Sequence, residues 1–431
     1  MIKDNCGNDE TNIAKRLKKL IEANHYLADI ESIDALLPRL LELAKNVTVA
    51  EASSLLLYNP KRNVLEFASV VDEVIGETGG EILKSSIELK MGEGIAGWVA
   101  ENRKALNIED VQQDPRFSKQ ADKQTGFITR NLLSVPLLYG EELLGVINAL
   151  NSKDKPSFDA EDQELLESFG HLAAVAITRS KLLENRFKQQ KFQIQLETAS
   201  KIQSLFWPEL AEIGADSHVW AISVPAAFVG GDLYDLIPMT DGSWMIYVAD
   251  VSDKGLPAAL IMVALWSKIR GEAFLHEEVD TLLQTVNDAM YVLMAEEGFF
   301  ATIILGRYWP ASGRLQLVCG GHLPPMWIRK DGLKSIPELK GLSLGVTPGT
   351  KYEKKEITLS PGESILFLTD GVTEAEDEHS ELYGNRRLID YIKKTNGPPL
   401  GKGLLDSINA WQGTTNPSDD LTILEIWRDP M

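Results

Sequence analysis

Cysteine, long apolar segments and positive charge are all scarce in this sequence of 431 residues. Its two cysteines, Cys6 and Cys319, are too few for a disulfide framework or for a zinc site built from cysteine. No apolar run approaches the length of a membrane span, and the first ten residues lack both the basic start and the apolar core of a signal peptide. We therefore expect a cytoplasmic protein that has no membrane partner.

Acidic residues outnumber basic ones, 63 to 43, which gives a formal net charge of −20. Nucleic acids and anionic membranes would repel such a chain, because their phosphates carry the same sign of charge. A phosphorylated substrate would need a local positive centre, such as a bound metal ion. With 44% hydrophobic residues, the chain is long enough for two or three domains, each with its own core.

The two halves of the chain differ in composition, and a long helical stretch joins them. Eight of the nine tryptophans lie at Trp207 or later, which indicates two unlike cores rather than a repeat. A helix is expected over roughly 159–207, because Asp159 and Asp162 can cap its start and Pro208 ends it. Its apolar residues follow three- and four-residue spacing in two stripes that are out of phase: Leu165, Phe169, Leu172, Ala176, Leu183, Phe187 and Ile194, then Phe192, Leu196, Ala199 and Phe206.

This helix has two interpretations. In one it is a dimerising coiled coil that passes a signal between domains, and the chain is a homodimer. In the other it packs on its own domains and transmits nothing. Few heptads are complete, but the spacing favours the coiled coil.

The N-terminal part alternates helix and strand signals, which is typical of an α+β fold. The expected helices cover 11–25, 32–46 and a short segment around Trp98, and the expected strands cover 53–58, 64–71, 87–89, 133–138 and 143–148. The last two strands are joined by 139–142, a hairpin signal.

Four segments of this part resemble a GAF domain over roughly 12–180, after a tail at 1–11: Met91–Asn102, Ala105–Asp110, Ser134–Leu138 and Leu144–Asn148. The resemblance implies a small-ligand sensor or a dimerisation module. Part of a motif of the cyclic-nucleotide-binding members is present at Asn151, Lys153, Phe158, Asp162 and Gln163. These positions could equally serve to cap the helix. His25 and His171 are expected to be packing or solvated residues, and no ligand is identified.

In the second half of the chain, three apolar runs each have an aspartate directly at one end. The run 244–249 ends at Asp250, the run 364–369 ends at Asp370, and the run 421–427 follows Asp419-Asp420. If the third strand is antiparallel to the others, these carboxylates share one sheet edge. Asp232 adds a fourth position after Gly230-Gly231, where the backbone can approach closely.

Clustered carboxylates repel one another unless a cation holds them together. Ligation by oxygen alone favours Mg²⁺ or Mn²⁺ over Zn²⁺. Two such ions can bind phosphate and lower the pKa of a shared water. A single aspartate at a strand end is more often a turn or a cap, but four together favour metal catalysis.

Five ordered motifs resemble the PP2C-type (PPM) serine/threonine phosphatases of the bacterial sporulation and stress-response branch: Gly230–Asp235, Asp250–Ala259, Gly320–Pro325, Thr369–Glu374 and Asp419–Thr422. The resemblance implies an α-β-β-α sandwich over 209–431, preceded by a helical linker at 181–208. It also implies two Mn²⁺ or Mg²⁺ ions. Asp250 would bridge both ions, and the Val251 carbonyl would ligate one of them. Asp370 and Asp419 would complete the ligand shell of the other ion. Asp232 would act directly or through water.

Some positions depart from the pattern of that family. Asp253 stands where glycine is usual, and Ser252 stands where the eukaryotic branch has a histidine proposed as general acid. Lys254 is the candidate for binding phosphate. Asp420 is expected to contact the metal ligands rather than a metal ion. His322 is expected to have a structural role rather than a catalytic one. Cys319 is interpreted as a buried small residue, and a helix over 256–273 should orient the Asp250 loop.

The sequence thus predicts a metal-dependent protein serine/threonine phosphatase regulated by a GAF domain. In the branch that it resembles, the usual substrate is a phosphorylated anti-anti-sigma protein of a partner-switching pathway. The alternative is a catalytically weak, ligand-sensing dimeric scaffold. A third interpretation is a dimer whose GAF output is interaction alone.

Overall fold

The computed structural model describes residues 21, 25, 27, 30, 32–72, 88–210, 212–336, 338–395 and 397–430. The chain forms two compact units, Met1–Lys191 and Phe192–Met431. The helix expected over 11–25 lies, apart from residues 21 and 25, outside the described residues. Within the described residues, no helix is both long enough and apolar enough to cross a bilayer.

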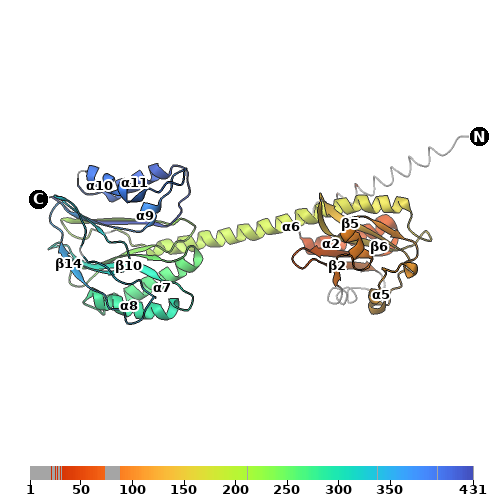
Figure 1. Ribbon diagram of the computed structural model, residues 1–431, viewed down its shortest axis with the longest axis horizontal. Coiled ribbons are helices and arrows are strands. Elements are labelled where there is room, and N and C mark those ends of the chain that lie inside the picture. The colour runs from red at the N-terminus through yellow and green to blue at the C-terminus, as the bar shows by residue number, and fades with distance from the viewer. Residues whose placement is uncertain are drawn as a thin grey trace, which may run out of the picture. The chain divides into compact units, whose positions relative to one another are not determined.

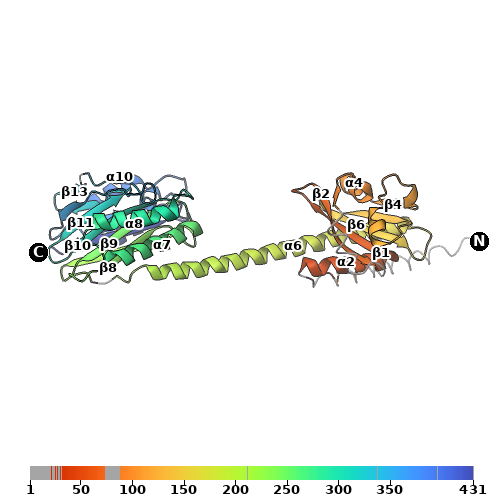
Figure 2. The same ribbon diagram turned by 90° about the horizontal axis from the view of Figure 1, so that it is seen from below.

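A six-stranded antiparallel sheet forms the centre of the first unit, in the order β3-β2-β1-β6-β5-β4 (Figures 1 and 2). The elements are α2 (Ile33–Thr48), β1 (Ala50–Asn59), β2 (Val64–Asp72), β3 (Glu88–Lys90), α4 (Gly94–Asn102), β4 (Leu106–Ile108), α5 (Gln120–Thr125), β5 (Leu132–Tyr139) and β6 (Glu142–Ser152). The expected strands and hairpin are confirmed, with Leu138 opposite Leu143 across the turn.

Side-chain alternation along the strands explains why this sheet carries helices on both faces. In β1, Leu55 packs in the core that includes α2, whereas the next residue, Leu56, packs in the core that includes α4. Ile147 and Val146 of β6 divide in the same way. A strand buried on both faces reads as a continuous apolar run.

Helix α6 (Ala160–Gln203) begins with the expected reciprocal cap. Asp159 Oδ1 accepts hydrogen bonds from the amides of Glu161 and Asp162, and Asp162 Oδ2 accepts one from the Asp159 amide, all at 3.0 Å. The first turns of α6 pack on the sheet through Phe169 and Ala173. The helix passes into the 3-10 turn η2 (Ser204–Phe206) just before Pro208.

Two five-stranded antiparallel sheets build the second unit, in the orders β14-β11-β10-β9-β8 and β13-β12-β15-β16-β7. The elements are β7 (Ser217–Val224), β8 (Leu233–Pro238), β9 (Trp244–Val251), α7 (Leu256–Ala273), α8 (Val279–Met294), β10 (Ala301–Trp309), β11 (Arg314–Gly320), β12 (Met326–Arg329), β13 (Gly332–Lys334), β14 (Lys355–Thr358), β15 (Ser364–Leu368), α9 (Gly371–Glu374), α10 (Gly384–Lys394), α11 (Gly401–Gln412) and β16 (Leu421–Arg428).

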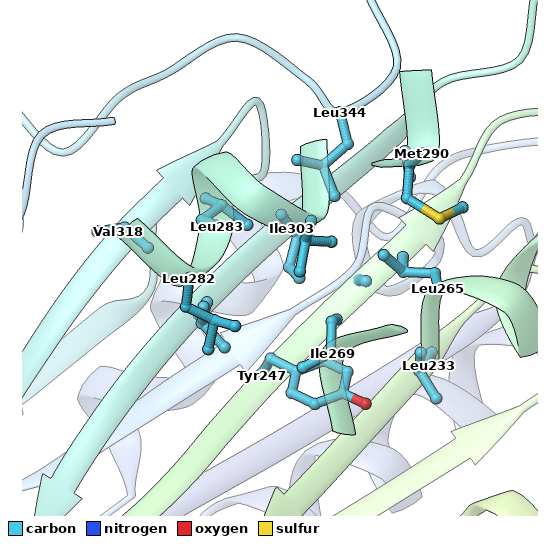
Figure 3. Close-up of a cluster of buried hydrophobic side chains, with 14 of the residues drawn as sticks. Leu233, Tyr247, Leu265, Ile269, Leu282, Leu283, Met290, Ile303, Val318 and Leu344 are labelled. Carbon is cyan, nitrogen blue, oxygen red and sulfur yellow. The ribbon is translucent and has the colours of Figure 1, made fainter. Parts of the chain in front are cut away.

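Three buried clusters define the layers of this unit. Leu265 and Ile269 of α7 and Leu282 and Leu283 of α8 pack on the first sheet around Tyr247 (Figure 3). A second cluster lies between the two sheets, and a third joins the second sheet to α9, α10 and α11. The order is therefore helix, sheet, sheet, helix, which confirms the expected α-β-β-α sandwich and the helix over 256–273.

Candidate metal centre

The predicted aspartates come together, but from two sheets rather than from one sheet edge. Asp250 lies in β9, one residue before that strand ends, in the first sheet. Asp370 precedes α9 after β15, and Asp419 precedes β16, both in the second sheet. The expectation of a single sheet edge was therefore wrong.

Alternation along β9 directs Asp250 toward the second sheet. Tyr247, Ala249 and Val251 belong to the cluster under α7 and α8, whereas Ile246 and Val248 belong to the cluster between the sheets. Asp250 follows Ile246 and Val248 in this period of two. Its carboxyl therefore faces the end of the second sheet, where the chain carries Asp370 and Asp419.

The glycine loop before Asp232 is fastened by Asp420. Asp420 Oδ1 accepts a hydrogen bond from the Ala226 amide at 2.8 Å, and its Oδ2 accepts one from the Gly231 amide at 2.6 Å. A β-carbon on Gly230 would collide with this carboxylate. Asp420 thus supports the loop that carries Asp232, and the loop requires glycine at position 230.

Burial and mutual repulsion hold the carboxyls of the cluster in an unfavourable electrostatic environment. Burial, with the charges of Asp370, Asp419 and Asp420, raises the pKa of Asp250 to about 7. Burial and the Asp250 charge raise the pKa of Asp232 well above its usual value. Burial and the Asp419 charge also raise the pKa of Asp370. A bound cation would relieve this repulsion.

Lys254 is a positive group at the cluster. Its Nζ lies 3.0 Å from Asp419 Oδ2 and donates a hydrogen bond to the Ser418 carbonyl at 2.6 Å. The preceding residue, Asp253, has φ of +74°, which explains why glycine is usual there. Ser252 extends the pairing of β9 with β10, because its amide donates to the Phe300 carbonyl and its hydroxyl accepts from the Phe300 amide, both at 2.9 Å.

The donor set fits a hard divalent cation. Among the described residues, no group of three or more His, Cys, Asp or Glu side chains is arranged to hold a metal ion as it stands. The cluster nevertheless offers carboxylate oxygens and a backbone carbonyl, the ligands that Mg²⁺ and Mn²⁺ prefer. A β-carbon on Gly231 would lie 2.8 Å from the Val251 carbonyl oxygen, so glycine leaves space beside that oxygen.

Sequence reasoning missed residues that orient or surround the cluster. Thr369 Oγ1 donates to Asp232 Oδ2 at 2.7 Å and accepts from the Thr422 amide at 2.8 Å. Burial, with the Asp370 and Asp419 charges, raises the pKa of Glu374. Thr369 and Glu374 are the first and last residues of the motif that contains Asp370. Their place in that motif was the sequence signal that could have identified them.

His322 and Cys319 are both buried, which confirms the prediction for Cys319. His322 Nδ1 and Thr302 Oγ1 lie 2.7 Å apart, and burial lowers the pKa of His322 to about 4. Cys319 is a free, buried thiol that lies 3.4 Å from the His322 carbonyl oxygen. These contacts agree with structural roles.

The first unit contains a separate cavity of about 170 Å³ beside α4 and the sheet. Leu56, Phe67, Ile95 and Phe127 contribute to its largely apolar wall, and Asn148 provides a polar point. His25 and His171 are exposed and do not line it.

Asn151 and Asp162, two residues of the cyclic-nucleotide motif, make hydrogen bonds within the fold. Asn151 Oδ1 accepts from the Arg130 amide, its Nδ2 donates to the Ile128 carbonyl, and Asp162 caps α6.

Comparison with known families agrees with both halves of this description. Residues 31–178 match the GAF domain family, and residues 240–429 match the family described as Stage II sporulation protein E (SpoIIE). The second unit is thus a domain of the PP2C phosphatase class. The chain carries a GAF domain followed by a PP2C-like domain of the SpoIIE family.

Individual relatives resemble parts of the chain. Protein IcfG of Synechocystis is 27% identical over 283 residues, which cover 58% of this chain and 44% of that protein. The probable 3',5'-cyclic phosphodiesterase pde-5 of Caenorhabditis elegans is 31% identical over 195 residues, covering 43% of this chain and 26% of that protein. The chain thus spans less than half the length of these curated relatives. The SiaA-PP2C domain of Pseudomonas aeruginosa matches with a TM-score of 0.49 and 22% identity, covering 56% of this chain and 98% of that structure.

Proposed function

We propose that the chain is a metal-dependent protein serine/threonine phosphatase regulated by its GAF domain. The observation that carries the proposal is the cluster of carboxyls from two sheets, within a SpoIIE-family domain, that raise one another's pKa. Such a cluster is stabilised by cations, and carboxyls with strongly raised pKa values are common at functional sites.

The cluster would hold two Mn²⁺ or Mg²⁺ ions. Asp250 would be shared between them and the Val251 carbonyl would serve one, while Asp370 and Asp419 would serve the other. Asp232 would act directly or through water. The bound ions would supply the positive charge that binds phosphate and acidifies water.

The protein's own residues would orient this site. Thr369 fixes the Asp232 carboxylate, and Asp420 fixes the loop that carries it. Lys254, which pairs with Asp419, is the residue that we propose to contact a phosphate bound at the cluster. The Ser252 hydroxyl accepts a hydrogen bond from the Phe300 amide, which extends the pairing of β9 with β10 beside the cluster.

The substrate that we propose is a phosphoserine or phosphothreonine of a small anti-anti-sigma-like protein. Resemblance of the five motifs to the sporulation and stress-response branch supports this assignment. Removal of the phosphate would return that protein to its unphosphorylated form in a partner-switching pathway.

Helix α6 supports homodimerisation through the linker and the GAF domain. Three of its exposed apolar residues, Leu183, Phe187 and Ile194, share one face of the helix, at 37%, 69% and 62% exposure. A second copy of the same helix would cover this apolar surface in a coiled coil.

Phosphate release from a phosphoserine protein by the full-length chain tests the proposal. We expect turnover that requires Mn²⁺ or Mg²⁺ and that Asp250→Ala abolishes, whereas Asp390→Ala, on the exposed side of α10, retains it. Full activity after chelation would contradict a metal mechanism. The alternative of a weak scaffold predicts little or no Mn²⁺ binding by calorimetry.

Deletion of residues 1–180 tests regulation separately. If the GAF domain regulates catalysis, the rate changes on deletion. If its output is interaction alone, the rate per catalytic domain is unchanged.

A further inference from the structure

The cavity of the first unit has two buried polar side chains in its mostly apolar wall. Ser54 of β1 and Asn148 of β6 are paired in the register of two adjacent strands, and both line the cavity. Residues directly opposite each other in an antiparallel pair point to the same face of the sheet. The two residues are 8% and 7% exposed. The sheet therefore presents a pair of buried polar groups to the cavity.

The carboxamide of Asn148 is only half satisfied. Its Nδ2 donates to Ser54 Oγ at 3.1 Å, whereas its buried Oδ1 has no hydrogen-bond partner among the described residues. Ser134 of β5 lies opposite Asn148 on the other side. Its hydroxyl is likewise buried without a partner in the described part of the chain, so the two side chains do not satisfy each other. An unpaired buried acceptor costs free energy that a donor on a bound molecule would recover.

The size of the cavity limits what it can hold. Its volume is about 170 Å³, and an apolar cavity of about 150 Å³ in another protein holds one benzene ring. One ring or two small fused rings are therefore of suitable size. A cyclic nucleotide is too large, because it adds a sugar and a phosphate to the rings of its base.

The charge of the wall opposes an anion. Among the described residues that line the cavity there is no Lys, Arg or His, and Asp122 of α5 is the charged member. Arg116, next to Phe117 of the wall, binds Asp114 at 2.9 and 2.6 Å and stacks on Trp98. A phosphate would therefore leave water for an apolar wall that offers no cation and includes a carboxylate.

Asp122 is held by hydrogen bonds within the fold. Its Oδ1 accepts from the Thr129 hydroxyl at 2.7 Å, and its Oδ2 accepts from the Thr129 amide at 2.9 Å. Both carboxylate oxygens thus have partners before any ligand binds. An uncharged ligand is favoured over a cation, because its entry into an apolar cavity requires no ion to lose its water.

We propose that this cavity binds an uncharged heterocycle of one or two fused rings that donates an N–H to Asn148 Oδ1, and that it rejects nucleotides and other anions. The partial cyclic-nucleotide motif gives no support to a nucleotide, because Asn151 and Asp162 make hydrogen bonds within the fold. Binding at this cavity is independent of the metal centre. Only its consequence, a changed rate of phosphate release, rests on the proposed function.

Calorimetric titration of the full-length protein with three compounds tests the proposal. Indole represents the expected class, benzofuran has nearly the same shape with an oxygen in place of the N–H, and cyclic GMP represents the nucleotides. We expect indole to bind about tenfold more tightly than benzofuran, because only indole satisfies Asn148 Oδ1. Cyclic GMP should not compete with indole.

Asn148→Leu tests whether the preference arises in this cavity, because leucine fills similar space but offers no acceptor. Asn185→Leu, at an exposed position of α6 outside the cavity wall, is the matched control. Asn148→Leu should bind indole and benzofuran with affinities within about twofold of each other, whereas Asn185→Leu should keep the preference of about tenfold.

Several results would overturn the proposal: no binding of indole, equal affinity of the wild type for indole and benzofuran, displacement of indole by cyclic GMP, or an unchanged preference in Asn148→Leu. If Asn148→Leu does not fold, the three titrations of the wild type still decide. Phosphate release is not a readout here, so a failure of the proposed function would leave the result on this cavity intact.

Discussion

Replacement of Asp250 by asparagine should stabilise the metal-free protein while abolishing its activity. Burial and three neighbouring aspartates raise the pKa of this carboxyl from 3.8 to about 7. A carboxyl whose pKa is raised on folding takes up protons as the chain folds, so its ionisation opposes folding at high pH. At pH 8 the difference corresponds to about 4 kcal/mol, since each pKa unit is worth about 1.4 kcal/mol.

The pH dependence gives the sign of this effect. The penalty begins above the unfolded pKa of 3.8, grows as the pH rises to about 7, and is constant above that. Asp250→Asn should therefore gain about 4 kcal/mol over wild type at pH 8 but only about 2 kcal/mol at pH 5. At either pH the variant should lose the additional stability that Mn²⁺ gives the wild type.

Tryptophan fluorescence during urea unfolding in EDTA is a suitable assay. Eight of the nine tryptophans lie at Trp207 or later, so the signal reports the unit that contains the cluster. Asp390→Asn, at an exposed position, is the control and should leave stability unchanged. A loss of stability in Asp250→Asn at pH 8 would refute the reasoning that the cluster is held together against its own repulsion.

Three further predictions follow from particular contacts. Arg270→Met should lower the free energy of unfolding by about 3 kcal/mol, because it leaves the buried Asp235 carboxylate without its cation. Arg314→Met removes an exposed ion pair and should lower it by less than about 1 kcal/mol. Equal losses in urea unfolding would contradict this prediction. Asp253→Gly should gain about 0.5–1 kcal/mol in the same assay, because it relieves a positive φ, and a loss would show that the strain argument is wrong. Ile194→Glu should convert dimers to monomers in sedimentation analysis, and an unchanged dimer would remove α6 from the interface.

Local signals in the sequence predicted most of the fold. The Asp159 cap and Pro208 bounded α6 because capping and proline act within a few residues of the helix end. The hairpin between β5 and β6 was predicted for the same reason, since its turn and its flanking apolar runs are contiguous.

Strand pairing and the support of the site depend on contacts between distant residues, which leave no periodic signal. The apolar runs of β9 and β15 look alike, so nothing local assigns them to different sheets. The Lys254–Asp419 pair joins segments more than 160 residues apart in sequence. The hydrogen bond from Gln203 to the Gly230 carbonyl joins residues 27 positions apart.

Anomalous diffraction from crystals grown with Mn²⁺ tests the central claim most directly. The account predicts two manganese peaks within ligand distance of Asp250, Asp370 and Asp419, one of them beside the Val251 carbonyl oxygen, and neither peak in crystals of Asp250→Ala. An absence of peaks at this cluster in the wild-type protein, or manganese bound only elsewhere, would contradict it.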